Sequence, residues 1–361
     1  KYDKFFLNII IVLLINPFYL FSYSFILSYM IVFGILLISK KLKKDKNIKS
    51  FIYNNILISS TSTLISLPIV VRISSDINIL SVLFNLFFIP FVSYILLPLS
   101  FIVFAIPKFE VIYEIFVKFF MFITNYLSKI KFFTINFAYF NLFLIIIFYL
   151  LITLIFINKK YKIKKILYVV FILYLFFLYY MPYLNIETSI SFIDLPSGDS
   201  TLIHTKFNKK NILIDTGDID ASNLISYLKS KGIKKLDAVI VSHGDSDHIG
   251  GLKSLIYEFD IKKVYLSYYD KVSVSEIKNY YLPRTNIFFL KKGDQFYIDD
   301  VYFNVLWPRS DQGDVNNNSL VIYTKIKNLS ILFTGDIESD AEKKLIKEIN
   351  TLDVDILKLA H

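Results

Sequence analysis

The chain has 361 residues, of which 55% are hydrophobic and 17% aromatic. Soluble proteins rarely reach its mean hydropathy of +0.54, which argues against a wholly soluble chain and predicts a membrane portion. The net charge of +10 does not by itself indicate a nucleic-acid partner, because membrane proteins also carry lysine-rich loops. The lack of cysteine excludes disulfides and thiolate metal sites.

Five long apolar runs fill the first half of the chain. They cover residues 18–38, 51–71, 79–106, 137–157 and 166–184. Each is close to the roughly 20 residues that a helix needs to cross the hydrocarbon core of a bilayer. Pro90 and Pro98 interrupt the third run, which predicts either a broken helix that lines a pathway or a simple pair of kinked helices. The segment 110–133 alternates aromatic and polar residues, and we expect it to lie in the interface or to cross.

Two lysine-rich loops set the expected orientation. They are "KKLKKDKNIK" at 40–49 and "KKYKIKK" at 159–165, and the positive-inside rule places both in the cytoplasm. The run after Lys165 must then leave the membrane on the other side. The sequence therefore predicts a multi-pass protein of the cell membrane, with a partial transmembrane domain at 1–184 and an extracytoplasmic domain at 185–361. We expect this chain to be a fragment, incomplete at both ends.

From Ile186 the pattern changes to short β-like runs separated by turns. "NILIDTG", "LDAVIVSH" and "LSILFTGD" are three of nine such runs, and helical periodicity occurs at 221–231, 273–282 and 339–349. Strands with interspersed helices are typical of a layered α/β domain. About 175 residues are enough for such a domain to bury a core of its own.

The stretch "VSHGDSDHIGGL" (241–252) concentrates side chains that bind metals. His243, Asp245, Asp247 and His248 follow a strand-like run directly. The end of a strand can hold loop side chains in a fixed array, and imidazole and carboxylate groups are ligands for divalent cations. The two glycines after them permit a close approach of backbone. An ordinary helix cap would explain one aspartate, but not two together with two histidines.

This stretch resembles the HxHxDH signature of metallo-β-lactamase-fold hydrolases, with Asp245 in place of the second histidine. Three further segments resemble that family in its chain order: "NILIDTGD" with Asp215, "ILFTGD" with Asp336, and "DILKLAH" with His361. His204 lies outside this set, and we expect it to be a surface or core histidine without a role in metal binding.

The resemblance narrows to ComEC-type competence proteins and covers nearly the whole chain. "FIDLPSGDSTLI", "NNNSLVIYT" and "TGDIE" are similar to segments of that family, as are "INPFYLFSYSFILSYMIVFGI" and "NLFFIPFVSYILLP" in the apolar half. "DLPSGDS" departs from the usual DVGQGDS, and "FILSY" from FQLSF. The resemblance implies a polytopic helical channel for single-stranded DNA in transformation, followed by an αββα domain proposed to hydrolyse the strand left outside. The implied partners are DNA, the lipid bilayer and other proteins of the uptake machinery.

The resemblance also implies a site for two divalent metal ions. His243 and Asp245 would bind the first ion, Asp247, His248 and His361 the second, and Asp336 would bridge them. The catalytic residues would then be Asp245, Asp247 and Asp336. An aspartate in place of a histidine hardens the site and shifts its preference from Zn²⁺ toward Mn²⁺ or Mg²⁺. We expect Mn²⁺ or Zn²⁺.

Four other polar residues are expected near the ions. Asp199 and Asp215 are candidates to orient the ligands or the turn backbone. Asn318 and Ser319 lie in a loop that either touches the ions or the substrate or is an ordinary asparagine-rich turn.

Two alternatives to a DNA-uptake channel with a nuclease domain stay open. One is a membrane-anchored metallohydrolase for a small ester, and the other is a transporter whose metal domain guides DNA without cutting it. The lysine clusters at 206–210, 229–235 and 291–292 would form a track for the DNA backbone or be a scattered solvated surface.

Overall fold

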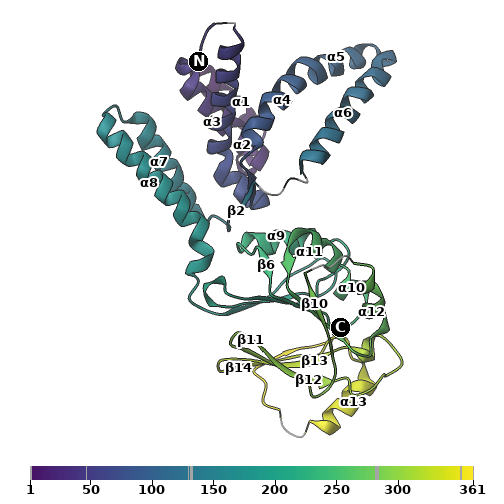
Figure 1. Ribbon diagram of the computed structural model, residues 1–361. Coiled ribbons are helices and arrows are strands. Elements are labelled where there is room, and N and C mark those ends of the chain that lie inside the picture. The colour runs from purple at the N-terminus through teal and green to yellow at the C-terminus, as the bar shows by residue number, and fades with distance from the viewer. Residues whose placement is uncertain are drawn as a thin grey trace. The chain divides into compact units, whose positions relative to one another are not determined.

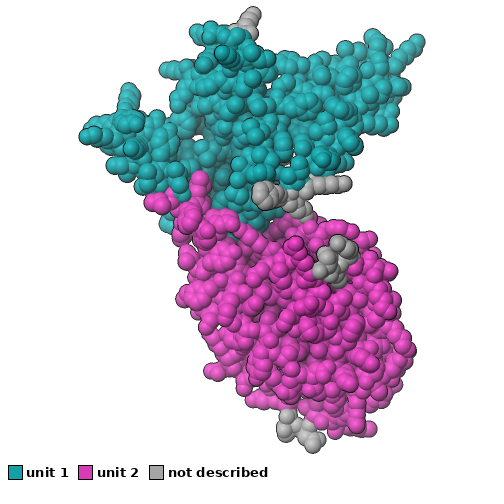
Figure 2. Space-filling view, in the orientation of Figure 1, with its two compact units in different colours: residues 1–172 teal, residues 173–361 magenta. Residues whose placement is uncertain are grey.

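The computed structural model describes residues 2–45, 47–128, 130, 133–280, 284–349 and 352–360. The chain divides into two compact units, Lys1–Ile172 and Leu173–His361, which Figure 2 shows in two colours. The division falls inside helix α8 (Tyr161–Tyr180), so this helix continues from the first unit into the second. The domain boundary that we predicted after residue 184 stays a prediction.

The first unit is helical (Figure 1). Its helices are α1 (Tyr2–Ile15), α2 (Tyr23–Ile38), α3 (Ile48–Ser74), α4 (Ser81–Phe91), α5 (Leu97–Ala105), α6 (Glu110–Ser128), α7 (Leu142–Ile157) and the first part of α8. Two short strands, β1 (Asp76–Asn78) and β2 (Thr134–Asn136), pair in antiparallel fashion between them.

Five helical segments of the described chain are long and apolar enough to cross a membrane. They are Tyr23–Lys41, Ile48–Ser74, Ser81–Ala105, Pro107–Ser128 and Tyr161–Leu184. Helix α7 is apolar as well but has only 16 residues. Large apolar side chains point outward from these helices, as at Phe122 (70% exposed) and Phe104 (91% exposed). Helices that are apolar on every side suit a lipid surrounding, where the backbone hydrogen bonds within each helix leave no polar group unpaired.

The interruption predicted from Pro90 and Pro98 takes the form of a π-helical stretch. Pro90 lies inside α4 and Pro98 in the first turn of α5, with one π-helical segment, Val92–Leu96, between them. The N–H of Leu97 donates to the carbonyl of Val92, five residues back. Proline lacks an N–H and displaces the carbonyl four residues before it, and a π-bulge is one way in which a helix accommodates this. The segment is therefore one bulged helix and not two separate ones.

The second unit contains two β-sheets that face each other (Figure 1). The first has the order β10-β9-β7-β5-β4-β3 and the second the order β11-β12-β13-β14-β15. The strands of the first sheet are β3 (Ser189–Phe192), β4 (Thr201–His204), β5 (Asn211–Ile214), β7 (Ala238–Ile240), β9 (Lys263–Ser267) and β10 (Asn286–Leu290). Those of the second are β11 (Gln295–Ile298), β12 (Val301–Trp307), β13 (Val321–Ile326), β14 (Leu329–Phe333) and β15 (Ile356–Lys358).

Helices cover the outer face of each sheet. They are α9 (Ser222–Ser230), α10 (Ser246–Ile249), α11 (Leu252–Glu258) and α12 (Lys271–Lys278) on the first sheet, and α13 (Ser339–Glu348) on the second. A short parallel pair, β6 (Lys235–Leu236) with β8 (Asp260–Ile261), lies beside the first sheet.

Strand alternation divides the apolar residues of this unit among three cores. In β5, Leu213 packs with the helices, whereas Ile212 and Ile214 pack toward the second sheet, because successive side chains of a strand point to opposite faces. Outside the second sheet, Trp307 packs with Leu345 of α13. The layers are therefore helix, sheet, sheet and helix, which confirms the predicted αββα domain after a helical membrane portion.

Phe303, at the centre of the core between the sheets, gives a test of this layering. Phe303→Ala should destabilise the second unit by about 3–5 kcal/mol, since the side chain is fully buried and leaves a cavity. Urea-dependent proteolysis of the solubilised protein measures this change. Tyr297→Ala is the matched control because Tyr297 is 69% exposed in the neighbouring strand. Equal losses for the two variants would contradict the assigned core.

Candidate metal centre

Three of the predicted ligands meet at one edge of the two sheets. His243 follows β7, His248 lies in α10, and Asp336 follows β14. One ligand atom from each of the three lies within 4.8 Å of the others. Both imidazoles are fully buried and their ring centroids are 4.2 Å apart. The edge formed where these strands end thus brings together residues that are about 90 positions apart in the sequence.

A divalent cation fits this cluster. The Nε2 atom of His243 is buried and has no hydrogen-bond partner among the described residues. The Nε2 atom of His248 lies 3.4 Å from Oδ2 of Asp336. Buried polar nitrogens are normally satisfied, and imidazole nitrogens that face a carboxylate form a donor set for a transition-metal ion. The residues present therefore suit the metal that the sequence predicts.

Asp245 and Asp247 flank the cluster on its solvent side. Oδ2 of Asp245 lies 3.7 Å from Nε2 of His243, and Oδ2 of Asp247 lies 3.8 Å from Nε2 of His248. Their side chains are 47% and 38% exposed. Each aspartate thus accompanies the histidine that the sequence assigned to the same ion. Their exposure places them where a substrate from solvent would arrive.

His361 lies outside the described residues. Its predicted role as a ligand of the second ion stays a prediction.

Asp215, a candidate to orient a ligand, contacts His248. Oδ2 of Asp215 lies 3.0 Å from Nδ1 of His248. Ser242 donates to the same carboxylate twice, from its N–H at 2.7 Å and from its hydroxyl at 3.0 Å. A carboxylate that accepts from Nδ1–H fixes the tautomer, so Nε2 is left to face the cluster. Sequence reasoning missed Ser242, which also lies 3.0 Å from Nδ1 of His243.

The charges around the two imidazoles give them opposite protonation behaviour. Burial lowers the pKa of His248, but Asp215 and Asp336 outweigh it and raise that pKa to about 10 in the protein without a cation. Burial, with the neighbouring His248, lowers the pKa of His243. Burial also acts to raise the pKa of Asp215, yet the hydrogen bond to His248 prevails and the pKa is lowered. Without a metal ion, the cluster of His243, His248 and Asp336 therefore holds a proton on His248, and a bound cation would take the place of that positive charge.

Asp199 supports the ligand loop through its backbone. Its N–H donates to the carbonyl of Asp247 at 3.2 Å, and its carboxylate contacts Nζ of Lys358 on β15. Gly198 before it has a φ of +78°, and a Cβ there would lie 2.0 Å from the Asp247 carbonyl oxygen. The "GD" of "SGDS" thus permits a close approach of two loops, which agrees with the orienting role predicted for Asp199.

The loop before β13 positions Asp336 through a serine. The Ser319 hydroxyl accepts from the N–H of Asp336 at 3.2 Å, and the N–H of Leu320 donates to the carbonyl of Ser242 at 2.9 Å. The Asn318 side chain is engaged elsewhere: its amide donates to Asp311 at 3.0 Å, and its oxygen accepts from the N–H of Gln312 at 2.9 Å. Asn318 therefore holds the neighbouring turn, as expected of an asparagine-rich loop.

His204 has the structural role expected of it. It is buried at the other end of the sheet, with Nδ1 2.6 Å from Oδ1 of Asn211.

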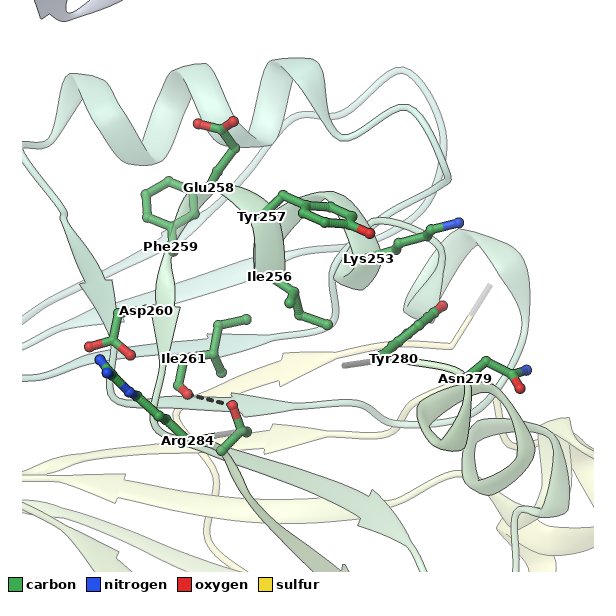
Figure 3. A pocket seen from close by; sticks show the side chains of 11 residues that line it. Lys253, Ile256, Tyr257, Glu258, Phe259, Asp260, Ile261, Asn279, Tyr280 and Arg284 are labelled. Carbon is green, nitrogen blue, oxygen red and sulfur yellow. Dashed lines mark hydrogen bonds between the residues drawn. The ribbon is translucent and has the colours of Figure 1, made fainter. Parts of the chain in front are cut away.

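One sizeable pocket of the second unit is separate from the cluster. It has a volume of about 690 Å³, and Figure 3 shows its lining side chains, among them Tyr257, Asp260 and Arg284. None of the lining residues belongs to the metal cluster. The candidate centre is therefore identified by its ligand chemistry and not by the size of a cavity.

Two family descriptions match the chain. Residues 2–162 match the family described as Competence protein, and residues 193–357 match the Metallo-beta-lactamase superfamily. The second match implies that the cluster binds divalent metal. The first, together with the apolar helices, makes the chain a multi-pass membrane protein.

Individual relatives agree with these matches. ComE operon protein 3 of Bacillus subtilis is 27% identical over 98% of this chain and 50% of its own length, so the chain spans about half of that relative. Competence protein ComA of Neisseria gonorrhoeae is 25% identical over 48% of this chain and 24% of its own. Among solved structures, Rm3 metallo-beta-lactamase aligns with a TM-score of 0.37 and 18% identity, covering 49% of this chain and 77% of that one. We assign the fold from the family match and the layer order.

Asp215→Asn tests the positioning of His248. An amide nitrogen would compete with Nδ1–H of His248, so metal affinity should fall about 10- to 100-fold. Competition with a metal chelator measures the affinity. Asp220→Asn is the control, since this aspartate accepts from Ser222 within its own exposed turn. Unchanged affinity in Asp215→Asn would mean that the hydrogen bond has no part in metal binding.

Proposed function

We propose that the chain, which matches the Competence protein family over residues 2–162 and the Metallo-beta-lactamase superfamily over residues 193–357, is part of a membrane channel that takes up single-stranded DNA in transformation. We further propose that its metal domain hydrolyses the strand that is not transported. The observation that carries the proposal is the cluster of His243, His248 and Asp336 in a domain that is joined directly to apolar helices.

The donor set suits phosphodiester hydrolysis. Two divalent ions, Mn²⁺ or Zn²⁺, would supply the positive charge that the transition state requires and would acidify a water molecule. The chain's own residues hold and orient this chemistry. The buried histidines offer Nε2 atoms whose direction Asp215 and Ser242 fix. The partly exposed Asp245 and Asp247 lie at the mouth, where a phosphate group would enter.

The helix count supports an extracytoplasmic metal domain. Between the lysine loops 40–49 and 159–165 lie α3, the bulged segment Ser81–Ala105, α6 and α7. If each of these four segments crosses the membrane, the chain returns to the side on which it began, so the two loops share one side. The positive-inside rule identifies that side as the cytoplasm. Helix α7 is about 24 Å long, slightly less than the hydrocarbon core. Helix α8 then delivers the second unit to the outside.

A reporter fusion tests this orientation. We expect an alkaline phosphatase fused after Ser310 in the full protein to be active, because that enzyme requires an oxidising, extracytoplasmic compartment. A fusion within the loop 159–165 should be inactive and serves as the control. The reverse pattern would place the metal domain in the cytoplasm, where it could not act on incoming DNA.

Nuclease activity is tested on Asp245. Asp245→Asn should lower hydrolysis of labelled single- or double-stranded DNA by the full protein at least 100-fold with Mn²⁺ or Zn²⁺, since an anionic group beside His243 is lost. Asp340→Asn removes the same charge from an exposed position on α13 and should cut DNA normally. Wild-type protein that cleaves a small ester but no DNA would instead favour the anchored-hydrolase alternative.

A further inference from the structure

Two lysine clusters that are separate in the sequence meet in the second unit. The side chain of Asn208 donates to the carbonyl of Gly232 at 3.3 Å, and that of Asn211 donates to the carbonyl of Lys235 at 3.3 Å. Asn211 is buried, and its amide also donates to Asn208 at 2.9 Å. These bonds join the segments 206–210 and 229–235, the second of which runs from the end of α9 to the start of β6. Seven lysines therefore lie on two adjoining segments: Lys206, Lys209, Lys210, Lys229, Lys231, Lys234 and Lys235.

A pocket of about 680 Å³ lies between these segments and the end of α8. Its lining includes Tyr183, Phe207, Lys209, Lys234, Lys235 and Asp260. Three lysines and one aspartate thus line it. Lys209 pairs with Asp299, Lys235 and Lys210 with Asp237, and Lys262 with Asp260, so that with Lys234 five lysines meet three aspartates here. The pocket is therefore suited to an anion.

The pocket adjoins the end of a candidate membrane span. Tyr183 lines the pocket and is the penultimate residue of the candidate span Tyr161–Leu184. Nζ of Lys234 lies 3.9 Å from the ring centroid of Tyr179 and donates to its hydroxyl at 2.7 Å. Tyrosine and lysine are the residues that anchor the ends of membrane spans at the headgroup level. Any bilayer that α8 crosses must bring its headgroups to this pocket.

Phe207 adds an apolar contact at the same place. Its backbone has a φ of +59°, which is strained for a residue with a bulky side chain, and the side chain is 51% exposed. Its N–H donates to the carbonyl of Asn185, where the chain leaves the span. A strained and exposed phenylalanine beside lysines has the composition of an interfacial anchor.

We propose that this pocket binds the phosphate of an anionic phospholipid headgroup, with Phe207 entering the acyl boundary. A DNA strand is the less favoured occupant because the metal cluster lies at the opposite ends of the strands. Strand β5 begins at Asn211 beside the pocket and ends next to Asp215 beside the cluster, about 13 Å away. The headgroup contact would hold the metal cluster away from the surface. This inference is independent of nuclease activity.

Native mass spectrometry of the full protein, titrated in detergent with phosphatidylglycerol or phosphatidylcholine, tests the proposal. We expect wild-type protein to retain phosphatidylglycerol at lower concentrations than phosphatidylcholine. K234Q/K235Q should require about 30-fold more phosphatidylglycerol, the factor for two lysines at an anionic surface. K343Q/K344Q removes a lysine pair from α13 and should behave as wild type.

A second variant distinguishes a loss of lipid binding from a folding defect. Phe207→Gly relieves the strained backbone yet removes the aromatic anchor, so it should keep its metal content while its phosphatidylglycerol retention falls several-fold. Equal retention of the two lipids, equal shifts in both lysine variants, or retention unchanged in Phe207→Gly would overturn the proposal. Displacement of the lipid by millimolar inorganic phosphate would assign the pocket to a soluble anion instead. Loss of binding to a fluorescent oligonucleotide by K234Q/K235Q, with lipid retention intact, would assign it to DNA.

Discussion

The metal centre depends on one buried interaction, the hydrogen bond between Asp215 and Nδ1 of His248. The Asp215 carboxylate is almost fully buried, and its backbone is held at a φ of +60°. An isolated carboxylate could not remain charged there, so the imidazole and Ser242 stabilise it as much as it orients them. The N–H and hydroxyl of Thr216 donate to the carbonyl of His248 at 2.7 and 2.9 Å, which fastens the ligand turn to the same strand end.

The same network joins the two sheets at the site. Ser242 contacts Asp215 through its side chain and accepts from Leu320 of the second sheet through its carbonyl. Gly335, at a φ of +55°, has no room for a Cβ, which would lie 2.6 Å from Cβ of Ser319. This close approach lets Asp336 reach the histidines from the other sheet. The geometry of the ligands is therefore a property of both sheets, and a loop alone would not hold it.

The sequence predicts the ligands better than the residues that support them. His243, Asp247 and their neighbours are visible because four ligand-type side chains in six positions have no structural explanation. A single Ser242 has no such signal, because its role arises from contacts between strands far apart in the chain. The αββα layers follow from strand alternation, but β10 and β11 were missed. Four of the five residues of β10 are exposed, so it lacks the apolar alternation that marks a half-buried strand. Helices α10 and α11 have four and seven residues, too few for helical periodicity to show.

Strands β5 and β7 run between two edges of the first sheet, and polar residues with different roles lie at each edge. They run parallel, so both begin at one edge of the sheet and end at the other. At the starting edge, Asp237 accepts from the N–H of Asn211 at 3.1 Å and pairs with Lys210 at 2.9 Å, beside the loops that adjoin α8. At the far edge, the same strands lead into Asp215 and Ser242. The residues between are fully apolar and buried, so neither edge can shift without moving the other. A rigid pair of strands thus fixes how far the metal ligands lie from the loops beside the candidate span Tyr161–Leu184.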